Sequence, residues 1–121
     1  MSFSSRPVVW HGDVVRSVGF LHVASPHVAV TREMIAEHAP WIGDVHLVDS
    51  TLFDDLVHGA EGRLTRLAAR IGELVGRDVD AVVCTCPELL DDVATAARAM
   101  GVAALDVADV RALSGTLALA S

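Results

Sequence analysis

Residues 61–89, EGRLTRLAARIGELVGRDVDAVVCTCPEL, contain an amphipathic stretch, a short apolar run and a turn in direct succession. In the first part, apolar residues recur with helical spacing at Leu64, Leu67, Ala68, Ile71, Leu74 and Val75. Gly76 then marks the end of a predicted helix over 61–75. The run Val79–Cys84 is apolar at every position except Asp80, as in a strand that is buried on both faces. The stretch therefore predicts a helix followed by an interior strand of a parallel sheet.

The same alternation of apolar runs and helical patterns extends along the chain in both directions. The other predicted strands cover Ser17–Val23, Asp44–Val48 and Val102–Leu105. The other predicted helices cover 28–38, Thr51–His58, Pro87–Met100 and 107–119. Strands joined by helical crossovers form a parallel sheet with helices on both faces. We predict an α/β fold, with a single flavodoxin-like domain built on a four-stranded parallel sheet of order 2-1-3-4.

The chain of 121 residues has the length of one domain, which can bury a core without a disulfide or a metal. Residues 1–16 have no clear period. We predict that they form a loosely structured N-terminal arm with a short strand at Pro7–Trp10. The predicted α/β domain then covers 17–121.

Charge and composition exclude several classes of protein. Nine arginines and no lysine face sixteen acidic residues, so the net charge is −7, and aromatic residues make up only 4%. Such a chain is a poor candidate for binding nucleic acid or an anionic membrane. No apolar run has the roughly 18–20 residues of a membrane span, and the N-terminus does not resemble a signal peptide. We therefore expect a soluble, cytoplasmic protein that binds neither nucleic acid nor membrane.

Ligands of open α/β sheets bind beyond the carboxyl ends of the strands, where the strand order reverses. The turn after the third predicted strand, Cys84-Thr85-Cys86-Pro87-Glu88, is the most informative one. A helix that starts at Pro87 would place its N-terminal field near Cys86 and lower the pKa of that thiol. The sequence thus predicts a reactive Cys86, with Cys84 packed inside the strand.

Two other interpretations of this turn stay open. Free cysteines are usually buried as small apolar side chains, and Thr85 with Glu88 fits a capping box. Cys84 and Cys86 would also form a redox or metal site if His22, His27 or His46 supplied a further ligand. Because two thiols are a weak metal signal, we predict no metal.

Three segments in this order resemble the aspartate/glutamate racemase superfamily. They are VGFLHVASPHV (18–28), VHLVDSTL (45–52) and DAVVCTCPEL (80–89). The superfamily includes hydantoin racemases, maleate isomerases and arylmalonate decarboxylases. Its members need no cofactor, and two similar domains each offer a cysteine to opposite faces of the substrate carbon.

The resemblance implies a racemase or isomerase that acts on a small carboxylate through a cysteine thiolate. Cys86 matches the catalytic cysteine of the first domain. The residues that match substrate-binding positions are Ser25, Asp49, Ser50 and Thr85. The chain corresponds to one domain of the family, so two-base chemistry would need a homodimer or a partner domain.

Departures from the family pattern lead to an alternative hypothesis. Pro87 and Glu88 stand where the family has Ser-Thr or Asn-Thr. Proline removes an amide donor, and the Glu88 carboxylate would repel a bound carboxylate. Residues 112–121, ALSGTLALAS, are apolar enough to form a surface for a partner. The alternative is a non-catalytic module for small-molecule binding or assembly.

Overall fold

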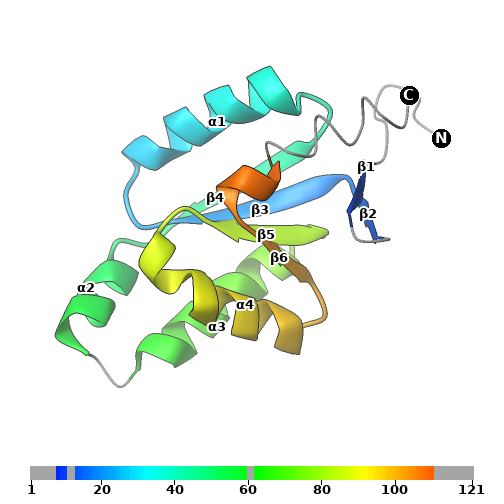
Figure 1. The fold of residues 1–121 in the computed structure, drawn as a ribbon. Helices are drawn as coiled ribbons and strands as arrows, with labels where there is room; N and C mark the ends of the chain where they lie inside the picture. The colour runs from blue at the N-terminus through cyan, green and yellow to red at the C-terminus, as the bar shows by residue number, and fades with distance from the viewer. Residues whose placement is uncertain (1–7, 11–12, 60–61, 111–121) are drawn as a thin grey trace.

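The computed structural model describes residues 8–10, 13–59 and 62–110 (Figure 1). Its strands are β1 (Val8–Trp10), β2 (Asp13–Val15), β3 (Ser17–His22), β4 (Gly43–Val48), β5 (Ala81–Cys84) and β6 (Ala103–Leu105). Its helices are α1 (Pro26–His38), α2 (Thr51–His58), α3 (Arg63–Val75) and α4 (Leu90–Ala99), with a 3-10 helix, η1 (Pro87–Leu89), before α4.

Strands β3 to β6 form one parallel sheet in the order β4-β3-β5-β6. This confirms the predicted α/β fold and the strand order 2-1-3-4. Strand β3 pairs with β4 from Ser17 opposite Gly43 to His22 opposite Val48. The short strand predicted near Pro7–Trp10 is present as β1, and it pairs antiparallel with β2, which the pattern did not predict.

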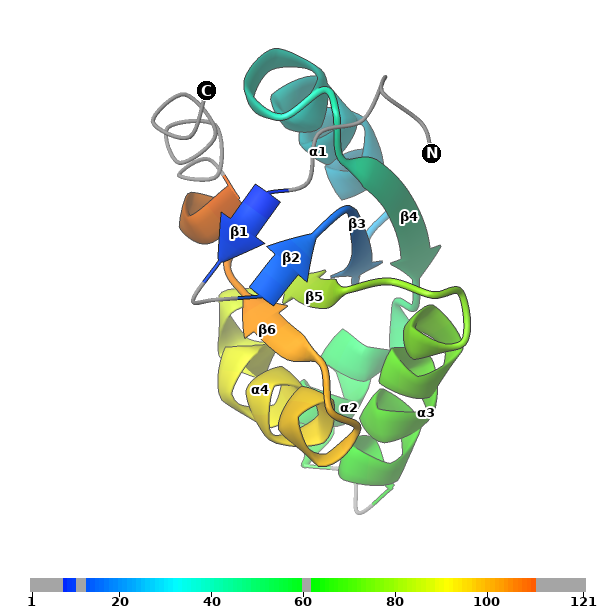
Figure 2. The same ribbon diagram turned by 90° about the vertical axis from the view of Figure 1, so that its right-hand side faces the viewer.

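Helices cover both faces of the sheet: α1 lies on one face, and α3 and α4 lie on the other (Figures 1 and 2). Each face has its own apolar core. The core under α1 is built from Val15, Val18, Phe20, Met34, Ile35, Ala39, Ile42, Ala81, Val83, Leu105 and Val110. The core under α3 and α4 includes Leu21, Leu52, Leu67, Ile71, Leu74, Val79, Val82, Cys84, Cys86, Leu89, Val93 and Ala97. The sheet thus separates two interiors of different composition.

Several predicted boundaries shift by a few residues. Helix α1 begins at Pro26, because proline fits the first helical position. The helix predicted over Pro87–Met100 is divided into η1 and α4. In α3, Leu67, Ile71 and Leu74 are buried as the spacing predicted, whereas Leu64 is exposed.

The predicted helix over 107–119 is partly visible as a helical turn at residues 107–110. The remainder of that helix and the apolar segment 112–121 lie outside the described residues, as do residues 1–7 of the predicted arm. Among the helices that the structure describes, none combines the length and the apolar character needed to cross a bilayer.

Strand β3 and helix α3 approach each other closely at Gly19. A Cβ atom placed there would lie 3.1 Å from Cβ and Cδ2 of Leu74. The glycine therefore allows α3 to pack directly on the central strand. This contact places the C-terminal end of α3 against the amino-terminal half of β3.

Candidate functional site

The strand order reverses between β3 and β5, because the chain leaves β3 for the edge strand β4 and then returns to β5. Residues that follow β3 and β5 therefore flank the position where such sheets bind ligands. Thr85 follows β5 directly, and its backbone N–H donates to the carbonyl of Leu21 at 3.1 Å. Its side chain is partly exposed at this edge.

Side-chain alternation sends Thr85 and its neighbouring cysteines to opposite faces of the sheet. Cys84 and Cys86 both lie in the core under α3 and α4. The Thr85 hydroxyl instead contacts His22, whose ring stacks on Phe20 in the core under α1. The turn after β5 therefore sends its side chains into two separate environments. The two cysteines enter the core under α3 and α4, and Thr85 contacts His22 on the α1 face.

On the α1 face, side chains from three neighbouring segments form one hydrogen-bonded chain. Thr85 Oγ1 lies 2.9 Å from His22 Nδ1, and His22 Nε2 lies 2.9 Å from His46 Nδ1. His46 Nε2 lies 2.6 Å from Asp44 Oδ2. We call this group, Thr85–His22–His46–Asp44, the histidine chain. It runs from the carboxyl edge of the sheet across β3 to the edge strand β4.

Burial controls the protonation of His22 in the histidine chain. His22 is completely buried, and its burial, with smaller contributions from His46 and His27, lowers its pKa to about 4. The His22 ring is therefore neutral at pH 7. The Phe20 ring stacks on the His46 ring with centroids 5.1 Å apart, which fixes the plane of the second imidazole.

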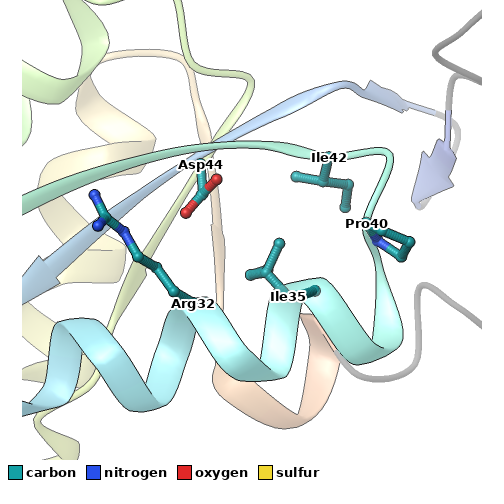
Figure 3. Close-up of a pocket in the computed structure, with 6 residues that line it drawn as sticks. Arg32, Ile35, Pro40, Ile42 and Asp44 are labelled. Atoms are coloured by element: carbon teal, nitrogen blue, oxygen red, sulfur yellow. The ribbon is translucent and has the colours of Figure 1, made fainter.

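The far end of the histidine chain reaches solvent beside a cavity of about 400 Å³. Arg32, Ile35, Pro40, Ile42 and Asp44 line this cavity between α1 and β4 (Figure 3). The Asp44 side chain is 29% exposed, whereas that of His46 is only 5% exposed. The chain thus connects two positions at the protein surface through a buried middle.

The prediction of an accessible, acidified thiolate at Cys86 is wrong. Cys86 is buried, and its thiol donates a hydrogen bond to Glu88 Oε2 at 3.2 Å. Burial, together with this hydrogen bond and the negative charge of Glu88, raises the pKa of Cys86. The electrostatic field at the start of the short η1 helix would lower the pKa of Cys86, but it does not overcome these effects. The same hydrogen bond lowers the pKa of Glu88.

Cys84 is packed inside the strand, as predicted. Its burial raises its pKa to about 11, and its thiol donates to the carbonyl of Cys86 at 3.6 Å. Among the residues that the structure describes, no cluster of three or more histidine, cysteine or acidic side chains could hold a metal ion.

The structure gives Asp49 partners of its own in the turn after β4. Its carboxylate accepts hydrogen bonds from the Thr51 backbone N–H at 2.9 Å and from Arg70 Nε at 2.8 Å. Burial acts to raise the pKa of Asp49, but the hydrogen bonds from Thr51 and Arg70 hold it below its ordinary value. Asp49 thereby fixes the start of α2 against α3.

Ser25 and Ser50 are both exposed. Ser25 lies in the loop between β3 and α1, and its side chain makes no capping hydrogen bond. Roles in substrate binding for Ser25, Asp49, Ser50 and Thr85 remain predictions. Of these residues, Thr85 is joined to the buried polar network.

Sequence reasoning missed the association of His22, His46 and Asp44. The signal was present in the register: His46 lies opposite Phe20 in the parallel ladder, so His22 lies two residues further along on the same face. Asp44 precedes His46 by two residues and shares that face. Recognising the group required pairing β3 with β4 in the correct register.

Comparisons of the chain with protein-family models, with curated proteins and with solved structures gave no match.

Proposed function

We propose that this domain binds a small carboxylate at the carboxyl edge of the sheet, between the Ser25 and Thr85 loops. The observation that carries the proposal is the histidine chain, which ends at the hydroxyl of Thr85, a partly exposed residue where the strand order reverses. A buried polar network costs stability unless every member is paired. Here it holds one hydroxyl in a fixed position at the site where such sheets bind ligands.

Other features of this rim are compatible with a small anionic ligand. The Ser25 hydroxyl is exposed and does not cap α1, and the first turn of α1 contains no acidic residue. Glu88 is the nearest acidic side chain along the chain after Thr85, and its Oε2 accepts the hydrogen bond of the Cys86 thiol. A hydroxyl that turns its proton outward can donate to a carboxylate oxygen, and the loops after β3 and β5 each carry one, Ser25 and Thr85.

The binding proposal is tested by NMR titration of the chain with acetate and glycolate at pH 6. The expected result is a set of amide shift changes centred on Ser25 and Thr85. Thr85→Val should weaken binding by tenfold or more, and Thr85→Ser should retain it. Thr95→Val, which alters an exposed threonine on α4, is the matched control. Shift changes confined to the Arg32 cavity, or none at all, would refute the proposal.

A second candidate is the isomerase function that the racemase resemblance implies. Its support is the order and spacing of the three matching segments; because the buried Cys86 thiol donates to Glu88 Oε2 at 3.2 Å, thiolate chemistry would first require this hydrogen bond to break. In this case Cys86 would exchange the α-proton of a bound carboxylate, and a homodimer or partner domain would supply the second thiol. The test is deuterium incorporation at the α-carbon of aspartate and glutamate in D₂O. Exchange that Cys86→Ser leaves unchanged contradicts this candidate.

A further inference from the structure

The hydrogen-bond directions in the histidine chain follow from its Asp44 end. A carboxylate only accepts hydrogen bonds, so His46 Nε2 must carry the proton that it shares with Asp44 Oδ2. When the His46 ring carries this single proton, its Nδ1 is an acceptor, and His22 Nε2–H donates to it. His22 Nδ1 is therefore also an acceptor, and the Thr85 hydroxyl donates to it. The carboxylate fixes the position of the His46 proton, and with one proton on each ring the remaining directions follow.

This direction has a consequence for ligand binding at Thr85. A hydroxyl has a single proton, and in this state that proton is donated inward to His22. The Thr85 oxygen then offers only lone pairs to a ligand, and lone pairs repel a carboxylate. Binding of an anion at Thr85 therefore requires the chain to reverse its direction.

We infer that the histidine chain couples carboxylate binding at Thr85 to the uptake of one proton. In the reversed state, the Thr85 O–H donates outward to the ligand, His22 Nδ1–H donates to Thr85, and His46 Nδ1–H donates to His22 Nε2. This inference rests on the proposed carboxylate site and specifies how that site recognises charge.

The proton balance of the reversal is complete. The incoming proton bonds to Thr85 Oγ1, the original hydroxyl proton moves to His22 Nδ1, and the His22 Nε2 proton moves to His46 Nδ1. The net result is one solvent proton gained and one positive charge on His46. Each proton moves along a hydrogen bond of 2.9 Å that already exists, so no side chain has to change position.

The surroundings of His46 suit the added charge. The Asp44 carboxylate lies 2.6 Å from His46 Nε2, and the Phe20 ring stacks on the imidazole. His22 is a poor site for the charge, because its burial and the nearby His46 and His27 lower its pKa. The other titratable groups nearby are Arg32, which lines the cavity with Asp44, and Cys86 with Glu88 on the η1 side, which pair with each other.

The experiment measures the affinity for acetate and glycolate by NMR between pH 6 and 8.5, a range in which both probes are ionised. We expect the Kd to rise with pH, approaching tenfold per unit, because one proton is bound with each carboxylate. In Asp44→Asn the counter-charge for His46 is lost, so binding should weaken at pH 6 while the Kd still rises towards tenfold per pH unit. Asp91→Asn, an exposed acidic residue on α4, is the charge-matched control and should behave as the wild type.

A second measurement needs no ligand and no variant. Imidazole ¹H–¹⁵N spectra at pH 7.5 should show His22 and His46 as neutral Nε2–H tautomers. If His22 carries its proton on Nδ1, the inference is overturned. A Kd that is independent of pH in the wild type also overturns it, while leaving the binding site in place. Absence of carboxylate binding at every pH instead refutes the proposed function.

Discussion

The two faces of the sheet bury side chains of different kinds. The face under α3 and α4 is filled with apolar side chains and two neutral thiols. The face under α1 holds an apolar core together with a fully buried histidine that has a partner at each ring nitrogen. The first face provides stability through packing. The second also holds a polar network whose directions depend on protons, and this difference predicts different responses to mutation and to pH.

The largest expected effect is on the apolar face. Ile71→Ala should lower the free energy of unfolding by about 2–5 kcal/mol, because it removes fully buried methylene groups and leaves a cavity. Urea denaturation at pH 6 and pH 8 measures this loss, which should be the same at both values. Leu64→Ala on the exposed side of the same helix is the control, with a change within about 0.5 kcal/mol. If the loss of unfolding free energy in Ile71→Ala changes with pH, the two faces do not differ in their pH dependence, and the comparison fails.

The next effect concerns the polar face and its pH dependence. The pKa of His22 is 6.5 in the unfolded chain and about 4 in the folded protein, so the unfolded state binds more protons between these values. Stability should therefore fall as the pH decreases from 6.5 to 4, by about 2–3 kcal/mol from this residue. The wild type and His22→Gln are compared by urea denaturation across this window. Equal losses in the two proteins would contradict the assignment.

A smaller effect tests the close contact on the apolar face. Gly19→Ala should lower the free energy of unfolding by about 1–2 kcal/mol, because the new methyl would lie too close to Leu74. Gly62→Ala, where no atom lies within 4 Å of the added methyl, is the control for the change of residue type. If Gly19→Ala unfolds at the same urea concentration as the wild type, the prediction is wrong, and α3 can move away from β3 to make room for the methyl group.

The smallest effect is kinetic and concerns the thiol at the carboxyl edge. Burial and Glu88 raise the pKa of Cys86, so iodoacetamide should label it at pH 7.5 more slowly than a free thiol. Glu88→Gln removes the acceptor charge and should speed this labelling a few-fold. Asp91→Gln on the neighbouring helix is the control. Labelling of wild-type Cys86 as fast as a free thiol would restore the reactive thiolate predicted from the sequence.

The sequence was sufficient to predict helices α1, α2 and α3, the four parallel strands and their order. The apolar spacing in residues 61–75 and the valine-rich run before Cys84 both reflect local periodicity, which the folded chain preserves. Position along the chain also predicted that Thr85 lies at the carboxyl edge. The short strand β2 and the division of the helix after Pro87 into η1 and α4 depend on local geometry that carries no periodic signal.

The chemistry of Cys86 and of the histidines was not predictable from local pattern. A helix start after Cys86 suggested an acidic thiol, but the direction of its side chain placed it in the core beside a carboxylate. Similarly, His22, His46 and Asp44 come from two strands, and their contact depends on the register between those strands. Burial and register are properties of the assembled sheet.

Periodicity and the chemistry of each residue type are written into the chain, and they determined the α/β architecture and the polar residues available at its edge. The tertiary structure decided which face each side chain occupies and which distant groups share a proton. The physical reason is that pKa values and hydrogen-bond directions depend on neighbours a few ångströms away in space, and in a parallel sheet those neighbours are many residues away in sequence.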